Sequence, residues 1–242
     1  MRKPRIILGI DEAGRGPIIG PMMIAGVAIR EDLAKDLGEK GVKDSKTLTP
    51  IERERLYNYI YELAEHLVIA RIEPQLIDEA NLNQIEYSTI SFIIERALAR
   101  LGNTITAIYI DAVGPKKKLI EKINRSTGIK TKQITVIVEE RADKKYPAVS
   151  AASILAKVAR DKAIEEYKKE YGEIGSGYPH DPRTINWIRK IYKENKNPPP
   201  IIRRTWSTLK KIAPKWYRPK RVLKGARKTR SILEYLNPDS SS

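Results

Sequence analysis

Short apolar runs and amphipathic segments alternate along most of the chain. Five apolar runs have the length and β-branched content of buried strands, and they cover residues 5–10, 22–29, 67–72, 105–110 and 134–138. Apolar residues at helical spacing predict helices over residues 51–66, 85–101, 117–124 and 150–171. Thr49-Pro50 is a start signal for the first of these helices. Strands that first follow one another and then alternate with helices are typical of an α/β sandwich with a mixed sheet.

The composition changes after the run Pro198-Pro199-Pro200. Residues 201–242 contain 12 Lys and Arg against two acidic residues, a net charge of +10. We therefore predict an α/β domain over residues 1–200 and a basic helical extension over residues 201–242, the end of which is disordered. Within the extension we expect a helix around Trp206 that packs on the core, with a basic face beyond Lys210.

The charge of the whole chain is strongly positive. Its 242 residues include 46 Lys and Arg and 30 Asp and Glu, a formal net charge of +16. Such an excess attracts phosphate polymers and anionic membrane surfaces. A highly charged surface of the thermophile type explains the abundance of charge but not its imbalance. The composition therefore favours a nucleic-acid-binding protein.

The residue types that are missing exclude several kinds of chemistry. The chain has no cysteine, which excludes disulfides, zinc fingers, thiol catalysis and iron–sulfur clusters. It has two histidines, His66 and His180. We expect His66 at the end of a helix, where a cation interacts favourably with the helix dipole, and His180 in a turn. Neither position predicts catalysis by histidine.

The apolar stretches are too short for membrane targeting. The N-terminal run is interrupted by Asp11 and is shorter than a signal peptide. The longest apolar stretch, residues 17–29, is broken by Gly and Pro, and it falls short of the roughly 20 residues needed to cross a bilayer. We therefore expect a cytoplasmic protein.

Acidic residues follow the predicted strands at three places. Asp11 and Glu12 come directly after the first strand, Asp111 follows the fourth, and Asp143 comes shortly after the fifth. Ligands of α/β sheets bind just beyond the strand ends, and carboxylates held close together repel one another unless a cation joins them. Oxygen ligands select a hard ion such as Mg²⁺ or Mn²⁺, and two ions roughly 4 Å apart suit phosphodiester cleavage. A single acid after a strand more often caps a helix, so the spacing alone leaves both interpretations open.

Two glycines surround Arg15 immediately beyond the acid pair, in the segment IDEAGRGPIIGPM. Glycine lets a backbone approach a ligand closely, and its exposed N–H groups can bind a phosphate or a sugar hydroxyl. Together with four further blocks, this segment resembles ribonuclease HII, and the archaeal form most. The blocks are DSKTL at 44–48, IYIDAVG at 108–114, ADKKYPAVSAASILAKVARD at 142–161 and GSGYPHDPRT at 175–184. They occur in that family's order and, with the first segment, span about residues 6–184.

The resemblance implies a fold and an activity. The fold is a ribonuclease H-like three-layer fold, with a mixed five-stranded sheet flanked by helices. The activity is that of a metal-dependent endonuclease on the RNA strand of RNA–DNA hybrids. It also cuts 5′ of ribonucleotides at RNA–DNA junctions or within duplex DNA, and leaves 3′-OH and 5′-phosphate ends. Asp11, Glu12, Asp111 and Asp143 match the family's catalytic metal-binding acids, and the implied cofactor is two Mg²⁺ or Mn²⁺ ions.

The resemblance also implies substrate contacts. Gly14, Arg15 and Gly16 match a turn whose backbone grips the ribose 2′-OH, the group that distinguishes RNA from DNA. Tyr178, in GSGYP, matches a tyrosine that stacks on the sugar at the RNA-to-DNA junction. Lys46, in DSK, matches a phosphate contact.

Several alternatives stay open at this point. Another two-metal nuclease, such as a junction resolvase, and a basic protein that coats RNA–DNA hybrids without cutting them also fit the charge and the acids. Lys157 is a further candidate phosphate contact, but a solvent-facing helix position explains it equally well. Residues 229–236 are a degenerate match to peptides that bind the sliding clamp (PCNA), although an ordinary terminal helix explains them too. We expect a monomer.

Overall fold

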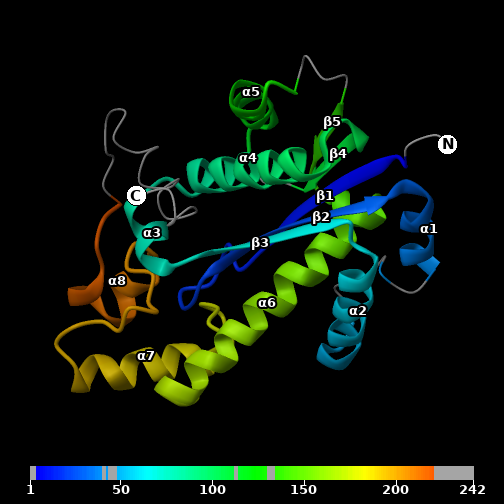
Figure 1. Ribbon diagram of the computed structural model, residues 1–242. Helices are drawn as coiled ribbons and strands as arrows, with labels where there is room; N and C mark the ends of the chain where they lie inside the picture. The colour runs from blue at the N-terminus through cyan, green and yellow to red at the C-terminus, as the bar shows by residue number, and fades with distance from the viewer. Residues whose placement is uncertain (1–3, 40–41, 43–47, 112–113, 130–133, 221–242) are drawn as a thin grey trace, which may run out of the picture.

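The protein is an α/β sandwich built on a five-stranded sheet in the order β3-β2-β1-β4-β5 (Figure 1). The computed structural model describes residues 4–39, 42, 48–111, 114–129 and 134–220. The strands are β1 (Ile6–Ala13), β2 (Met22–Arg30), β3 (His66–Ile72), β4 (Ile105–Asp111) and β5 (Thr135–Glu139). Strand β2 is antiparallel to both of its neighbours, β1 and β3, whereas β1, β4 and β5 run parallel to one another. The mixed five-stranded sheet expected from the sequence is confirmed.

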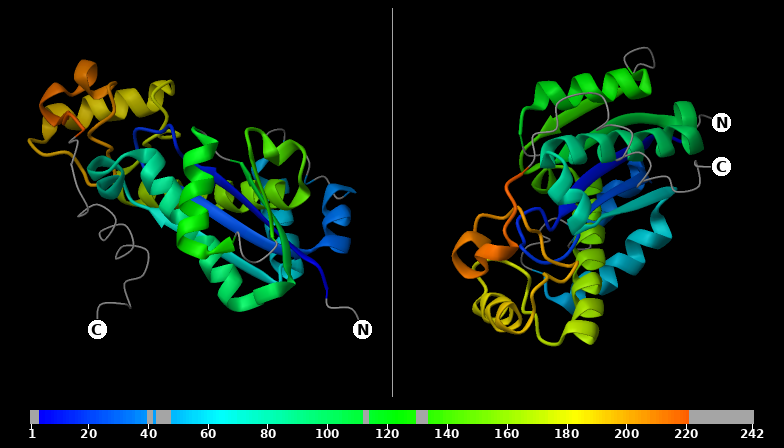
Figure 2. Two further views of the ribbon diagram at one scale, coloured as in Figure 1. Left: turned by 90° about the horizontal axis from the view of Figure 1, so that it is seen from above. Right: turned by 90° about the vertical axis from the view of Figure 1, so that its left-hand side faces the viewer.

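One face of the sheet is covered by α4 (Leu82–Leu101) and α5 (Lys116–Thr127). These two helices lie above the sheet in Figure 1 and on one side of it in Figure 2. Leu8 and Ile10 of β1 pack in this layer, together with Ile108 and Ile110 of β4. Because side chains alternate between the two faces of a strand, the even-numbered residues of both strands face α4.

The opposite face is covered by α6 (Pro147–Tyr171), with α2 (Pro50–Leu63) and α1 (Glu31–Glu39) beside it. A glycine allows α6 to lie directly against the sheet: a Cβ at Gly9 would come within 2.1 Å of the backbone of Ala148. The odd-numbered residues of β1 and β4 therefore face the start of α6, where the chain returns from β5.

A third cluster lies at the far end of α6 and contains α7 (Pro182–Glu194) and the short α8 (Leu209–Ile212). It joins Ile18 and Ile19 to Ile201, Ile202 and Trp216, all of them buried. The boundary expected after residue 200 therefore does not coincide with a break in packing, because the chain to Trp216 belongs to the same body. Residues 221–242, including the expected disordered end, lie outside the described residues.

Three local expectations were incomplete or wrong. His66 is the first residue of β3 and not the end of a helix, since α2 already ends at Leu63. Trp206 lies in irregular chain before α8, so the helix expected around it is absent, but its side chain packs against the core as expected. The pattern also missed α1 and α7, as well as α3 (Pro74–Glu79). The remaining short elements are the 3₁₀ turns η2 (Gly102–Thr104), η4 (Ala142–Lys144) and η5 (Pro214–Trp216).

Among the described residues, no helix combines the length and the apolar character that crossing a membrane requires.

Candidate active site

The parallel pairing of β1 with β4 brings two of the predicted acids together. Ile10 is the register partner of Ile110, so Asp11 and Asp111 come next at the same level of neighbouring strands. Both are odd-numbered and therefore point to the α6 face of the sheet. Asp11 also accepts a hydrogen bond from Ser153 of α6, which fixes its carboxylate toward that helix.

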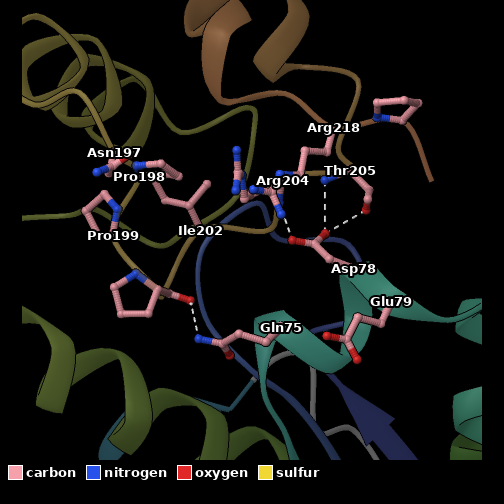
Figure 3. Close-up of a pocket in the computed structure, with 12 residues that line it drawn as sticks. Gln75, Asp78, Glu79, Asn197, Pro198, Pro199, Ile202, Arg204, Thr205 and Arg218 are labelled. Atoms are coloured by element: carbon pink, nitrogen blue, oxygen red, sulfur yellow. Dashed lines mark hydrogen bonds between the residues drawn. The ribbon is translucent and has the colours of Figure 1, made fainter. Parts of the chain in front are cut away.

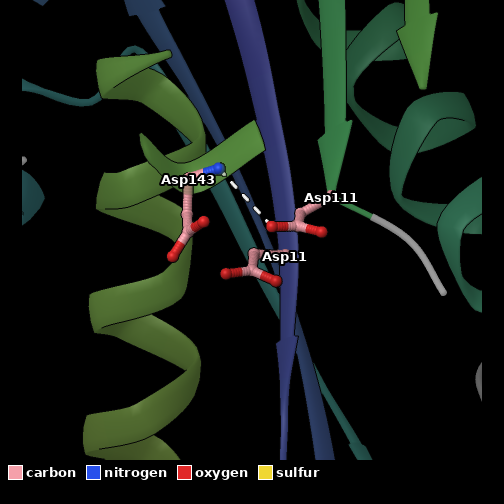
Figure 4. A group of neighbouring side chains, drawn as sticks. All are labelled: Asp11, Asp111 and Asp143. Atoms are coloured by element: carbon pink, nitrogen blue, oxygen red, sulfur yellow. Dashed lines mark hydrogen bonds between the residues drawn. The ribbon is translucent and has the colours of Figure 1, made fainter. Parts of the chain in front are cut away.

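A tight turn after β5 brings the third acid, Asp143, to the same place (Figure 4). Arg141, just before η4, has φ 60° and is the only non-glycine among the described residues with a positive φ. The turn directs two backbone N–H groups at Asp111: that of Arg141 donates to Oδ1 at 3.2 Å and that of Asp143 to Oδ2 at 3.4 Å. The strained backbone thus ties the end of β4 to the start of α6.

Asp11, Asp111 and Asp143 form a compact cluster of carboxylates. Each has an oxygen within 4.8 Å of the others. Burial, together with the charge of Glu12, raises the pKa of Asp11 well above its ordinary value. Burial also raises the pKa of Asp111, and the charge of Asp143 adds to this rise. Buried acids that repel one another in this way form a donor set that fits a hard divalent cation, since such a cation offsets their charge.

Glu12, the fourth predicted acid, lies beside the cluster and not within it. As an even-numbered residue of β1 it leaves the strand toward the α4 face, where Arg15 lies near it. Burial raises the pKa of Glu12 to about 7, against the opposing effect of Arg15, and Asp111 adds to the rise. The charge of Asp111 therefore acts on Glu12, although Glu12 is not one of the three clustered carboxylates.

The Gly14–Gly16 loop follows directly after Glu12. Gly14 has φ 81°, and a Cβ there would come within 2.7 Å of the carbonyl oxygen of Pro21, so only glycine fits this turn without strain. The guanidinium of Arg15 pairs with Glu86 of α4 and donates to the side-chain oxygen of Asn83. Since the Glu86 side chain is fully buried, Arg15 is held against α4.

Tyr178 lies across from the loop, where it is held by Arg160. The guanidinium of Arg160 lies 5.0 Å from the centre of the Tyr178 ring and donates to the carbonyl of Ser176. Tyr178 and the loop line one hollow of about 400 Å³, named here the loop hollow. Its lining residues are Glu12, Ala13, Gly14, Arg15, Gly16, Arg53, Lys157, Arg160, Asp161 and Tyr178. The hollow thus joins the Gly14–Gly16 loop, an aromatic ring and several cations, and Glu12 in its lining connects it to the acid-bearing end of β1.

The two predicted lysine contacts have different outcomes. Lys46 lies outside the described residues, as does the DSK loop that contains it. Lys157 lines the loop hollow, which favours a contact with substrate over a purely solvent-facing position. Glu86, Arg160 and Ser153 also contribute to the site and were not predicted from the sequence. Their pattern offers no distinct signal, because a single polar residue on a helix is ordinary.

A second, larger hollow of about 970 Å³ lies between α3 and the segment that follows Pro198–Pro200 (Figure 3). It is lined by Gln75, Asp78 and Arg204 among others. None of the predicted site residues belongs to it.

Solved structures define the class of this fold. The crystal structure of ribonuclease H2 from Pyrococcus horikoshii OT3 matches with a TM-score of 0.77 and 40% identity, over 87% of this chain and 98% of that one. A ribonuclease HIII, Bst-RNase HIII in complex with Mn²⁺, matches with a TM-score of 0.65 and 20% identity, over 86% and 69%. The α/β sandwich is therefore a ribonuclease H-like fold.

Sequence comparison identifies the family. The family model for Ribonuclease HII matches residues 8–209. Ribonuclease HII of Hyperthermus butylicus is 47% identical over 100% of this chain and 99% of its own length. That of Thermococcus onnurineus is 48% identical over 86% and 90%. The chain belongs to the ribonuclease HII family, and the resemblance expected from the sequence motifs is confirmed.

The family defines the general activity. The protein is an endoribonuclease, a hydrolase of the ribonuclease H type that acts on RNA–DNA substrates. Enzymes of this family depend on a divalent metal ion, and the cluster of Asp11, Asp111 and Asp143 is a donor set suited to one.

Proposed function

We propose that the chain cuts the phosphodiester bond on the 5′ side of a ribonucleotide, in RNA–DNA hybrids and within duplex DNA, with two Mg²⁺ or Mn²⁺ ions as cofactor. The observation that carries this proposal is the position of the acid cluster beside the loop hollow. A phosphate next to Asp11 and Asp111 would have its neighbouring sugar at the Gly14–Gly16 loop. The site therefore combines cleavage with a test of the sugar.

The loop and Tyr178 select the substrate. The backbone N–H groups of the loop bind the ribose 2′-OH and the adjoining phosphate while they tolerate any base, because they do not reach a base edge. Tyr178 stacks on the sugar that follows. Lys157, and Lys46 outside the described residues, contact phosphates. The guanidinium of Arg15 is engaged with Glu86, so in this proposal Arg15 contributes its backbone N–H.

The acids hold the cofactor. Asp11, Asp111 and Asp143 would hold the ions, and Glu12 beside them would contribute a further carboxylate. When bound, divalent cations stabilise negative charge on the phosphate oxygens and favour ionisation of water. Water attacks phosphorus, the bond from phosphorus to the 3′ oxygen breaks, and the products carry a 3′-OH and a 5′-phosphate. Ser153 keeps Asp11 oriented through this reaction.

The cut position on a DNA duplex with one embedded ribonucleotide tests the proposal. We expect a single cut directly 5′ of the ribonucleotide, which leaves a 3′-OH on one fragment and a 5′-phosphate on the other, and which occurs with Mg²⁺ and not with EDTA. An all-DNA duplex of the same sequence and a four-way junction serve as controls. Cleavage of the junction, or a cut 3′ of the ribonucleotide, would contradict the proposal.

Replacement of Asp111 separates cleavage from binding. We expect Asp111→Asn to abolish cleavage, because it removes a carboxylate from the metal-binding cluster. Binding to the ribonucleotide duplex is retained or tightened, because one negative charge near the phosphate is lost. Gel-based cleavage and equilibrium binding assays measure the two effects. Loss of binding together with cleavage would indicate that Asp111 has a structural role.

We also propose a sliding clamp as a partner. The structure of the PCNA:RNase HII complex from Archaeoglobus fulgidus matches with a TM-score of 0.72 and 34% identity, over 84% of this chain and 94% of that one. The predicted clamp peptide, residues 229–236, lies outside the described residues. The test compares clamp binding by the whole chain with clamp binding by an Ile232→Ala variant, which we expect to bind more weakly. Light scattering separately tests the expectation that the protein is a monomer.

A further inference from the structure

The segment that follows Pro200 pairs with the chain that leaves the Gly14–Gly16 loop. The N–H of Gly20 donates to the carbonyl of Ile201 at 2.8 Å, and the N–H of Arg203 donates to the carbonyl of Ile18 at 2.9 Å. A residue nearly 190 positions from the loop is thereby fixed beside it. The first arginine of the basic extension predicted over residues 201–242, Arg203, is therefore buried in the protein and not exposed to a ligand.

Asp78 of α3 anchors the same segment from the other side (Figure 3). Its carboxylate accepts from the N–H of Arg204 at 2.7 Å, and from the N–H and the hydroxyl of Thr205 at 3.0 and 2.7 Å. Three hydrogen bonds to one carboxylate leave the segment little freedom. The side chains on either side of it, Arg203 and Trp206, are therefore held in fixed positions.

Arg203 is fully buried, and within the described residues its guanidinium donates hydrogen bonds only to backbone carbonyls. Nη2 donates to Gly14 at 2.6 Å, Nη1 to Arg15 at 3.0 Å and Nε to Gly20 at 2.8 Å. No carboxylate of the described residues forms an ion pair with it. A buried charge is costly unless hydrogen bonds satisfy it, so these three carbonyls are part of what makes the burial of Arg203 tolerable.

Trp206 completes the set of contacts with the loop. Its Nε1 donates to the carbonyl of Gly16 at 2.9 Å, and its ring lies 5.0 Å from the guanidinium of Arg203. The carbonyls of all three loop residues are thus satisfied by two side chains from one segment.

Because the peptide bond is planar, the directions of these carbonyls also determine where the N–H groups of the loop point. In a trans peptide, the C=O of one residue and the N–H of the next point in opposite directions. With the carbonyls of Gly14 and Arg15 directed at Arg203, the N–H groups of Arg15 and Gly16 point away from it. Since Arg203 is buried and Gly16 is exposed, these N–H groups face the side from which a ligand approaches.

We propose that Arg203 is a positioning residue that holds the carbonyls of Gly14 and Arg15 inward, so that the N–H groups of Arg15 and Gly16 are aligned for the ribose 2′-OH. Trp206 supports this arrangement, because its ring lies over the Arg203 guanidinium and its Nε1 holds the end of the loop at the carbonyl of Gly16. The peptide after Gly16 leads to Pro17, which has no N–H, so the contact of Trp206 steadies the loop without orienting a donor itself. Neither residue touches the substrate. The proposal rests on the proposed function of the loop, and it assigns the discrimination between ribose and deoxyribose to a segment more than 180 residues away.

The test is Trp206→Phe, which keeps an aromatic ring over Arg203 and removes one N–H. Trp187→Phe is a matched control, because Trp187 Nε1 donates to the carbonyl of Tyr171 at 3.0 Å, away from the loop. For each variant we would measure KM on a duplex with one ribonucleotide and the inhibition constant of the all-DNA duplex as competitor. The ratio of the inhibition constant to KM reports preference for the ribonucleotide. A loss of folded enzyme lowers the rate but leaves this ratio unchanged.

We expect the ratio to fall about threefold to tenfold in Trp206→Phe, the effect of one hydrogen bond, and to stay within twofold of wild type in Trp187→Phe. Arg203→Lys, which keeps the charge but loses the planar set of donors, should lower the ratio further. Unchanged ratios in both Trp206→Phe and Arg203→Lys, or falls no larger than that of Trp187→Phe, would overturn the proposal. A wild-type enzyme without preference for the ribonucleotide would instead contradict the proposed function.

Discussion

Gly14 and Gly16 have different local environments, and the difference separates folding from substrate contact. A Cβ at Gly14 would clash with the carbonyl of Pro21, whereas a Cβ at Gly16 would meet nothing closer than Tyr178 Cε1 at 3.8 Å. We expect Gly14→Ala to lower the free energy of unfolding by about 1–3 kcal/mol, because it strains a turn with positive φ. Gly16→Ala should leave thermal stability unchanged.

The same pair of variants should differ in activity. In Gly16→Ala the added methyl group stands where the sugar approaches, so kcat/KM should fall on the order of 100-fold, as for a misplaced substrate. Thermal melting and steady-state kinetics on the ribonucleotide duplex measure the two effects. A Gly16→Ala enzyme with full activity would show that the substrate does not approach this face of the loop.

The ion pair of Arg15 with Glu86 should contribute to stability through burial. The Glu86 side chain is fully buried, so Arg15→Ala leaves a charge without its partner and should cost about 3–5 kcal/mol. Arg15→Ala combined with Glu86→Gln should recover much of that loss. As a control, Arg5→Ala breaks an exposed pair with Glu31 and should cost less than about 1 kcal/mol. Urea unfolding of the three variants and the wild type measures these costs, and similar costs for Arg15→Ala and Arg5→Ala would contradict the argument.

At the residue scale, the identity of the candidate site residues was easier to predict from the sequence than their arrangement in space. Asp11 and Asp111 follow strands, so their meeting was predictable once those strands were taken as neighbours. The displacement of Glu12 from the cluster follows from strand alternation, but only when the pairing of β1 with β2 is known to continue to Ala13. The burial of Arg203 was not predictable, because a lysine- and arginine-rich segment is normally exposed.

Helix α7 depends on a cap that carries charge. Asp181 precedes Pro182, and its carboxylate accepts from the N–H of Ser176 and of Arg183 as well as from the Arg183 guanidinium. The hydrogen bond from the Arg183 side chain has the largest effect, and together these contacts hold the pKa of Asp181 well below its ordinary value. We expect Asp181→Ala to cost about 1 kcal/mol at neutral pH, the usual effect of a lost cap.

The cost of Asp181→Ala should depend on pH. A carboxyl with a lowered pKa stabilises the fold fully above its ordinary pKa of 3.8, and this contribution is lost as the pH falls toward the lower folded-state pKa. The difference between wild type and variant should therefore be constant above about pH 5 and shrink below about pH 4. Asp181→Asn, which retains a capping oxygen, is the control. A difference that grows toward low pH would contradict the assignment.

At the element scale most strands and long helices were predictable because their apolar spacing is regular. Of the missed helices, α1 and α3 are short, whereas α7 has 13 residues and carries Ile185, Ile188 and Ile191 at regular spacing. Asp181-Pro182 did carry a start signal for α7, since Pro is favoured in the first turn and Asp at the cap, and a search for caps would have found it. The assignment of His66 to a helix failed because nothing in the spacing marks the end of α2 at Leu63.

Over the whole molecule, binding of a divalent cation and folding should be linked. Asp11, Asp111 and Asp143 come from three segments and repel one another without a cation. We expect Asp111→Asn to raise the melting temperature in EDTA by about 2–4 °C, the shift that about 1 kcal/mol produces in a chain of this size. Mg²⁺ should stabilise wild type more than this variant. Glu54→Gln, at an exposed position, should behave as wild type, and equal effects of Mg²⁺ on all three proteins would contradict the linkage.

The contacts of Arg203 also affect the order in which parts of the site form during protein synthesis. A ribosome synthesises the chain from the N-terminus, so Asp11, Glu12, Asp111 and Asp143 emerge well before Arg203 does. Until then the Gly14–Gly16 turn lacks the guanidinium that orients it, even if the sheet has already formed. A nascent chain therefore contains its cutting residues before it contains the residue that orients the Gly14–Gly16 turn, and full selectivity arises only once Arg203 has been synthesised and packed beside that turn.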